Sequence, residues 1–204
     1  MFITLEGGEG SGKSTAIKKI VPELEKMGYE VVLTREPGGT PISEEIRNVI
    51  LDKKNTAMDP MTEALLYAAS RRQHIVEKIR PALKEGKIVL CDRFLDSSLA
   101  YQGGARELGI NRVFALNQYA TEGLLPDLTL FFELKPEEGI KRIEANANRE
   151  VNRLDVEKMS FHQKVHDAFE ELVRRYPNRI VKIDASKKPE EVAEEAYRAI
   201  KERL

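Results

Sequence analysis

Several features that define other classes of protein are missing or rare in this sequence. Its 204 residues include a single cysteine, Cys91, which excludes an internal disulfide, and no tryptophan. No apolar run reaches the roughly 18 residues that a membrane-spanning helix requires, so we expect no membrane partner. No signal peptide precedes the apolar run Phe2–Leu5, and together with the rarity of cysteine this predicts a cytoplasmic protein.

A surplus of either charge is missing too. The sequence has 33 Lys and Arg residues against 34 Asp and Glu residues, which gives a formal net charge of −1. Because binding along a nucleic-acid backbone needs a surplus of Lys and Arg, we expect no nucleic-acid partner. A small phosphorylated ligand needs only local positive charge and is not excluded. The composition, 41% hydrophobic and 33% charged residues, is that of a folded chain, and the length predicts one domain over residues 1–204.

Short apolar runs alternate with amphipathic stretches along the whole chain. The apolar runs predict five strands, over Phe2–Leu5, Glu30–Thr34, Lys87–Cys91, Leu128–Glu133 and Arg179–Ile183. Helical spacing predicts helices over Lys13–Met27, Ile42–Leu51, Met61–Lys84, Asn111–Glu122, Pro136–Ala145, Phe161–Tyr176 and Pro189–Leu204. The alternation predicts an α/β fold with a parallel sheet covered on both faces. Ligands of such sheets bind beyond the carboxyl ends of the strands.

A glycine-rich segment follows the first predicted strand and precedes the first helix. It fits the pattern G-x-x-x-x-G-K-[ST] of phosphate-binding loops with the residues Gly7, Gly8, Glu9, Gly10, Ser11, Gly12, Lys13 and Ser14. Glycines let backbone N–H groups surround a phosphate, and the helix N-terminus adds positive potential. Lys13 can reach the β- and γ-phosphates, and the Ser14 hydroxyl can ligate Mg²⁺. The segment predicts a site for a nucleoside triphosphate with Mg²⁺, to which we also assign Thr15.

Glu9 is unusual inside such a loop, because a carboxylate beside phosphates is electrostatically unfavourable. The loop alone leaves two interpretations open. Either Glu9 faces away to solvent, or it contacts a hydroxyl group of a second substrate.

Two opposite charges, Asp92 and Arg93, follow the third predicted strand. Charged groups at the end of a buried strand are costly to desolvate unless they have a use. One interpretation is a salt bridge that fixes the end of the strand. In the other, Asp92 holds Mg²⁺ through water and Arg93 binds a phosphate. The nearby phosphate-binding loop favours the second, and the absence of the GTPase signature N-K-x-D indicates a small-molecule kinase.

The stretch from Leu90 to Gln102 resembles the signature of the thymidylate (dTMP) kinases. Residues 35–40 and 67–71 resemble two further motifs of that family, and the similarity, closest to the bacterial type, runs from Phe2 to the final helix. The resemblance implies a P-loop NTPase fold of the nucleoside-monophosphate-kinase type, with a five-stranded parallel sheet flanked by helices and a short lid. It also implies transfer of the ATP γ-phosphoryl group to dTMP with Mg²⁺, in dTTP biosynthesis, by a homodimer.

The resemblance assigns roles on the acceptor side. Glu9 matches the carboxylate that accepts from the 3′-hydroxyl of dTMP, Tyr67 the ring that stacks on thymine, and Arg71 the reader of a thymine carbonyl. The remaining matches are Ser97, Ser98 and Gln102 around the base, Tyr101 at the 2′ side of the sugar, and Arg47, Arg93 and Glu36 at the acceptor phosphate. From the residues alone, Tyr67 is equally an ordinary core residue, and Arg47 and Glu36 are equally solvated surface charges.

The polar, aperiodic stretch Asn146–Asp155 predicts a lid over about residues 146–157. Arg149 and Arg153 in it can move onto the transferred phosphoryl group, and the alternative is a flexible charged connection. On the adenine side, Arg142 resembles the residue that packs on the base, and Ala185 belongs to the matching loop. The three histidines are interpreted as structural or surface residues, since His162 and His166 lie four residues apart on a helix but lack a partner.

Two rival functions remain in view. One is a nucleoside-monophosphate kinase that acts on another base, against which Arg71, Tyr101 and Gln102 argue. The other is a non-catalytic ATP-binding regulator. The joint presence of Lys13, the Asp92–Arg93 pair and the lid arginines argues against it, because binding alone needs no lid.

Overall fold

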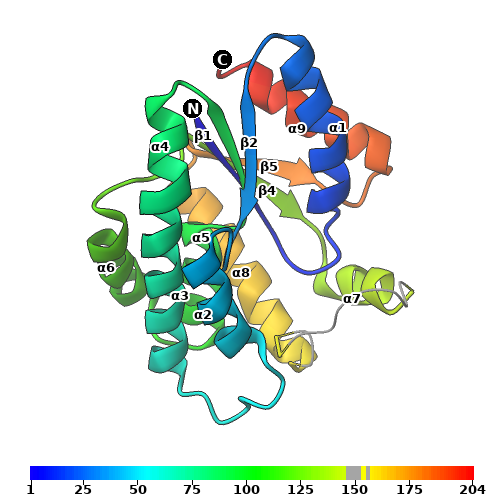
Figure 1. The fold of residues 1–204 in the computed structure, drawn as a ribbon. Coiled ribbons are helices and arrows are strands. Elements are labelled where there is room, and N and C mark those ends of the chain that lie inside the picture. The colour runs from blue at the N-terminus through cyan, green and yellow to red at the C-terminus, as the bar shows by residue number, and fades with distance from the viewer. Residues whose placement is uncertain (146–152, 155–156) are drawn as a thin grey trace.

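The computed structural model describes residues 1–145, 153–154 and 157–204, and its centre is a sheet of five parallel strands (Figure 1). The strands are β1 (Phe2–Glu6), β2 (Val31–Arg35), β3 (Ile88–Asp92), β4 (Leu128–Glu133) and β5 (Ile180–Asp184). Their order across the sheet is β2-β3-β1-β4-β5, and every neighbouring pair is parallel. The predicted parallel α/β architecture is confirmed.

Helices cover both faces of the sheet. They are α1 (Lys13–Lys26), α2 (Pro41–Leu51), α3 (Pro60–His74), η1 (Ile75–Ile79), α4 (Arg80–Lys84), α5 (Leu95–Ser98), η2 (Leu99–Ala105), α6 (Ile110–Thr121), α7 (Pro136–Glu144), α8 (Met159–Arg175) and α9 (Pro189–Lys201). On one face α1 and α9 pack against Ile3 and Leu130. On the other, η1, η2 and α8 pack against Phe2 and Phe131. Successive strand residues therefore serve opposite cores, as the period of two requires.

The predicted helix over Met61–Lys84 is continuous but not uniform. It consists of α3, a π-helical turn η1 and α4. Pro81, in the first turn of α4, has no backbone N–H to donate and so interrupts the regular hydrogen-bond ladder. The change of helical type lies where the proline requires it.

A helical segment that the sequence did not predict runs through α5 and η2, over residues 95–105. Its glycines hide it from periodicity, because glycine is a poor helix former. Packing explains one of them: a Cβ on Gly104 would lie 2.5 Å from the Cβ of Ala168 on α8. The small residue lets the two helices approach closely.

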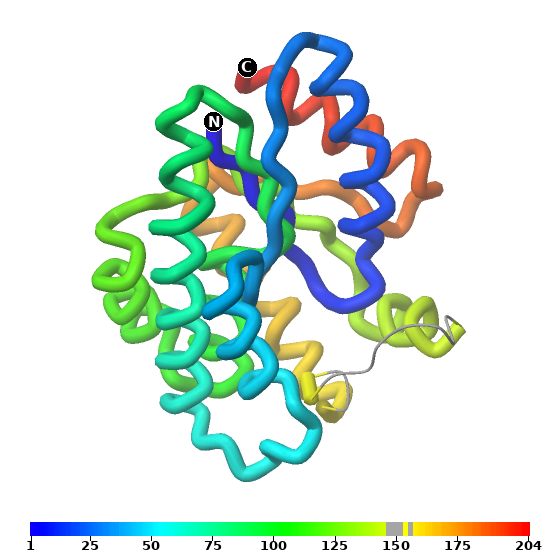
Figure 2. Tube along the Cα trace, viewed as in Figure 1, coloured from blue at the N-terminus to red at the C-terminus, as the bar shows by residue number. Residues whose placement is uncertain are grey.

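The topology places the two predicted motifs side by side. Strands β1 and β3 are neighbours, and Leu5 lies in register with Asp92. The chain leaves β1 in a loop that returns into α1 (Figure 2), so this loop lies next to Asp92 and Arg93. Within the described residues, no helix is both long and apolar enough to cross a membrane.

Candidate active site

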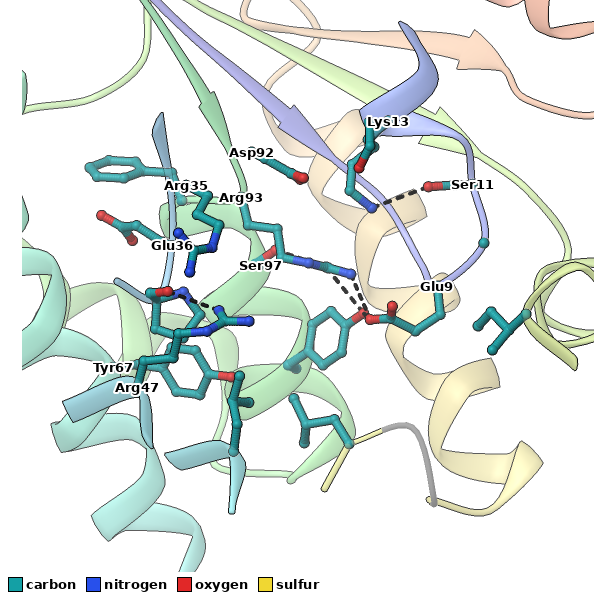
Figure 3. A pocket seen from close by; sticks show the side chains of 18 of the residues that line it. Glu9, Ser11, Lys13, Arg35, Glu36, Arg47, Tyr67, Asp92, Arg93 and Ser97 are labelled. Carbon is teal, nitrogen blue, oxygen red and sulfur yellow. Dashed lines mark hydrogen bonds and ion pairs between the residues drawn. The ribbon is translucent and has the colours of Figure 1, made fainter. Parts of the chain in front are cut away.

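A cavity of about 410 Å³ opens beyond the carboxyl ends of β1, β2 and β3. It brings together most residues of the predicted site (Figure 3). These are Glu9, Gly10, Ser11, Gly12, Lys13, Ser14, Thr15, Glu36, Arg47, Tyr67, Arg71, Asp92, Arg93, Ser97, Tyr101, Gln102 and Arg142. The predicted donor and acceptor residues thus line one continuous space.

The phosphate-binding loop is held in shape by its own lysine. The Lys13 Nζ donates to the carbonyls of Gly7 and Gly8 and to the Ser11 hydroxyl, each at 3.2 Å. Gly7 and Gly8 therefore serve the loop through their backbone and do not line the cavity. Burial, followed by the charge of Arg93, lowers the pKa of Lys13 to about 8. An anionic ligand near this ammonium has the opposite effect on the pKa, because it favours the charged form.

Arg93 connects the loop after β3 to the loop after β1. Its guanidinium donates to the Gly7 carbonyl at 2.9 Å and to Glu9 Oε1 at 2.6 Å. The Tyr101 hydroxyl donates to the same carboxylate oxygen at 3.3 Å. Glu9 is only 14% exposed at its side chain, so the interpretation that it faces away to solvent is wrong. Its carboxylate points across the cavity toward the acceptor side (Figure 3).

Asp92 carries an oxygen that is available for a ligand. Its Oδ1 atom is buried and has no hydrogen-bond partner among the described residues, and Ser14 lines the same cavity. A carboxylate and a hydroxyl are the oxygen ligands that Mg²⁺ prefers. These two side chains therefore fit a magnesium site, directly or through water.

Arg71 lies at the base of the acceptor side and is 1% exposed. Its guanidinium donates to Glu36 at 2.8 Å, to the Phe94 carbonyl at 2.9 Å, to Ser98 at 3.0 Å and to Asn117. Glu36 is 4% exposed, which excludes its interpretation as a surface charge. Ser98 thus lies behind Arg71 and outside the cavity lining.

Arg142 and Arg47 line the cavity and are each also hydrogen-bonded to a backbone carbonyl. Arg142 donates from its guanidinium to the carbonyl of Ala185 at 3.0 Å, which brings the two predicted adenine-side residues together. Arg47 donates to the Pro37 carbonyl at 2.9 Å and still lines the cavity. Ala185 itself is buried beneath Arg142.

Arg153 lies away from the phosphate-binding loop in this structure. Its Nε donates to the Ile50 carbonyl at 3.0 Å, and its side chain forms a buried ion pair with Glu63. Glu63 also accepts from Gln102 at 2.8 Å. Arg149, and the predicted lid apart from residues 153, 154 and 157, lie outside the described residues.

Glu6 is a functional candidate that the sequence reasoning missed. It is fully buried at the end of β1 and accepts from the backbone N–H of Phe94 at 2.8 Å and from the Ser97 hydroxyl. Burial, followed by the charge of Asp96, raises its pKa from 4.5 to about 7. The only sequence signal is a carboxylate that ends an apolar strand. Arg35, which also lines the cavity, was missed as well.

The fold and the cavity together define a P-loop kinase of the nucleoside-monophosphate-kinase type. The family described as "Thymidylate kinase" matches residues 5–196 of the chain, and the chain belongs to this family. It is 56% identical over 204 residues to thymidylate kinase of Bacillus pumilus, which covers all of this chain and 96% of that one. It is 58% identical over 194 residues to the enzyme of Clostridium novyi, with 95% of each chain covered. The crystal structure of thymidylate kinase from Ehrlichia chaffeensis aligns with a TM-score of 0.80 and 32% identity over 98% of both chains.

Proposed function

We propose that this kinase transfers the γ-phosphoryl group of ATP to dTMP, which yields dTDP and ADP for dTTP biosynthesis. The contact between Arg93 and Glu9 at 2.6 Å is the observation that carries the proposal. It joins the phosphate-binding loop to the signature segment that follows β3, so one cavity serves a donor and an acceptor. Membership in the thymidylate kinase family supports ATP as donor and dTMP as acceptor.

On the donor side, the loop amides of residues 7–12 and the Lys13 ammonium bind the ATP phosphates. Thr15 continues this contact at the start of α1, and Arg142 packs on the adenine above Ala185. Ser14 and Asp92 hold Mg²⁺, which when bound neutralises charge on the β- and γ-phosphates. The Asp92 Oδ1 atom without a protein partner supports this placement.

On the acceptor side, Tyr67 stacks on thymine and Arg71 donates to a thymine carbonyl. Four of the five N–H groups of Arg71 are directed at protein acceptors, which fixes the guanidinium in one orientation. Ser97 and Gln102 complete the polar surroundings of the base, while Ser98 acts on it through Arg71.

Sugar and phosphate are recognised by residues around Glu9. Its carboxylate accepts from the 3′-hydroxyl, while the Tyr101 ring closes the 2′ side and disfavours a ribose hydroxyl. Burial raises the pKa of Tyr101 above its usual value, so its hydroxyl stays protonated and donates to Glu9. Arg47 and Arg93 bind the acceptor phosphate. Glu36, near the same phosphate, orients the guanidinium of Arg71 through their hydrogen bond.

The transfer itself needs no covalent intermediate, because positioning and positive charge lower the barrier for phosphoryl transfer. Lys13 and Arg93 supply that charge from the described part of the site. We assign Arg149 and Arg153 of the lid to the same task. For Arg153 this requires that its guanidinium leave Glu63 when the nucleotides bind.

We further propose that the protein acts as a cytoplasmic homodimer. Apolar side chains are exposed on neighbouring helices: Leu65 and Val76 at 50% and 38% on α3 and η1, and Tyr119 at 91% on α6. Exposed apolar side chains on helices that pack against one another are candidates for such an interface. Sedimentation of the purified protein tests this part.

A coupled assay of ADP release across nucleoside monophosphates tests the activity. We expect turnover with dTMP, dependence on Mg²⁺ and ATP, and much lower rates with dCMP, dAMP and dGMP. Preference for another base would identify the first rival kinase. Nucleotide binding without turnover on any monophosphate would instead support a regulator.

A further inference from the structure

Three side chains with no role in the proposed reaction gather at the carboxyl end of β4. Glu133 is the last residue of β4, while His166 and Glu170 lie about one turn apart on α8. One ligand atom from each lies within 4.8 Å of the other two. The sequence interpretation that His166 lacks a partner is wrong, because its Nε2 atom lies 3.2 Å from Glu133 Oε1, on a strand 33 residues earlier.

We propose that Glu133, His166 and Glu170 bind one divalent cation of the zinc type. An imidazole nitrogen with two carboxylate oxygens is a mixed ligand set that suits Zn²⁺ and similar transition metals. Mg²⁺ prefers oxygen ligands alone, so this site differs in its chemistry from the Ser14 and Asp92 pair. The proposal does not rest on the proposed kinase reaction.

Ligand atoms in this cluster have capacity for a further contact. His166 Nδ1 is a buried atom without a hydrogen-bond partner among the described residues, whereas Glu170 Oε1 is paired only with the side chain of Lys182. The neighbouring His162 is 7% exposed and has an equally unpartnered Nε2 atom, and it lines a cavity of about 20 Å³ together with His166. Buried polar atoms normally have partners, and two exceptions on neighbouring imidazole rings point to a ligand.

The contacts that do exist hold the cluster in place without saturating it. His166 Nε2 lies 3.2 Å from Glu133 Oε1, so the imidazole ring and this carboxylate already face one another. Asp167 Oδ1 is 3.7 Å from His166 Nδ1, a separation too long for a hydrogen bond.

The spacing is compatible with metal binding after small side-chain movements. Two ligands of a tetrahedral zinc ion lie about 3.4 Å apart, given bonds of about 2.0–2.2 Å. The side chains of Glu133, His166 and Glu170 are 26%, 19% and 26% exposed, so the cluster is open to ions from solvent. Because two of the ligands come from one rigid helix, only Glu133 must adjust from another element.

Lys182 on β5 competes with the proposed cation. Its Nζ atom lies 2.6 Å from Glu170 Oε1 and neutralises this carboxylate in the absence of metal. Its side chain is 43% exposed, so the ammonium can turn into solvent when a cation binds. The ammonium and the metal exclude one another by charge, and removal of Lys182 is therefore expected to strengthen metal binding.

Titration of the tag-free, nucleotide-free protein with Co²⁺ and Zn²⁺ tests the proposal. We expect the visible Co²⁺ spectrum to intensify and saturate at one cation per chain, and Zn²⁺ to displace it. Zn²⁺ at a hundred times its Kd is expected to raise the Tm by about 5–10 °C. The same titration of Asp92→Asn must give an unchanged spectrum, which separates this site from the active site.

Three variants test whether the Co²⁺ affinity falls, rises or stays the same as the proposal requires. His166→Gln is expected to weaken Co²⁺ binding at least about ten-fold, and Lys182→Gln to strengthen it. Glu171→Gln, an exposed neighbour on the same helix, is the matched control and keeps the wild-type affinity. Absence of a saturable Co²⁺ spectrum, equal affinity in His166→Gln, or unchanged or weaker affinity in Lys182→Gln would each overturn the proposal.

Discussion

Glu6 accepts a hydrogen bond from the backbone N–H of Phe94 at 2.8 Å across 88 positions of the sequence. This contact ties the end of β1 to the turn after β3. Arg93 directly precedes Phe94 and has a backbone φ of 68°, which residues other than glycine rarely adopt. The second oxygen of Glu6 accepts from Ser97. One buried carboxylate thus holds the segment that directly follows the arginine that reaches Glu9.

Replacement of Glu6 tests this positioning role. Glu6→Gln keeps the shape but places an amide N–H group against one of two donors. We expect kcat/KM for dTMP to fall by about 10–100-fold, since a small displacement of a positioned group is costly. Glu25→Gln, an exposed substitution on α1, is the control in the same steady-state assay. Equal kinetics of the two variants would refute the role.

The raised pKa of Glu6 predicts a pH dependence of stability. Its pKa is about 7 in the folded protein against 4.5 for the unperturbed group, so the folded state binds the proton more tightly. The contribution of Glu6 to stability is therefore complete below pH 4.5 and is lost as the pH rises to about 7. Urea unfolding of wild type and Glu6→Gln between pH 4.5 and 8 measures this. The wild type should lose more stability with rising pH than the variant, and parallel curves would contradict the prediction.

Lys13→Ala tests the phosphate-binding loop. The substitution removes the positive charge that stabilises the transferred phosphoryl group. We therefore expect kcat to fall by at least about 10²–10³-fold. The variant also loses three contacts to the loop, so circular dichroism must first show that it folds. Undiminished kcat in the folded variant would exclude Lys13 from phosphoryl transfer.

Tyr101→Ala tests discrimination against ribonucleotides. Removal of the ring opens the 2′ side of the sugar, and the ratio of kcat/KM for dTMP over ribothymidine monophosphate should fall about ten-fold or more. Tyr101→Phe keeps the ring and is the control for the loss of the hydroxyl alone. If the alanine variant keeps the wild-type ratio, another group excludes the ribose.

Glu63→Gln tests the buried ion pair of Arg153. Glu63 is fully buried and is contacted by Arg153 and by Arg106 at 3.3 Å. Loss of its charge leaves the cations uncompensated, and we expect the free energy of unfolding to fall by about 3–5 kcal/mol. Glu107→Gln, which breaks an exposed pair with Lys164, serves as control in the same urea titration. A variant as stable as wild type would show that the pair is not maintained in solution.

Local patterns predicted most of the fold. Strand β4 has its predicted bounds, and the phosphate-binding loop lies between β1 and α1 as expected, because apolar runs and glycine spacing are local signals. The helical segment over residues 95–105 escaped prediction, since its glycines are explained only by tertiary neighbours: Gly103 lies against Ile110 and Gly104 against Ala168 of α8. Periodicity contains no information about such partners.

Residues of the candidate site could be predicted from the sequence only where they belong to a motif with a known chemical role. The resemblance named most cavity residues, and the structure places them together, while their individual roles stay predictions. Glu6 could not be found because its partners depend on the order of the strands. The location of Arg153 was equally hidden, since its buried partner lies 90 residues away.

The contacts of Arg93 with Gly7 and Glu9 have a thermodynamic consequence for the two substrates. A ligand that draws this guanidinium toward the acceptor phosphate also perturbs a carbonyl of the donor loop, since Gly7 accepts from both Arg93 and Lys13. The free energies of binding of the two nucleotides are then coupled. Because such coupling is reciprocal, whatever dTMP does to the affinity for ATP, ATP does to the affinity for dTMP by the same factor.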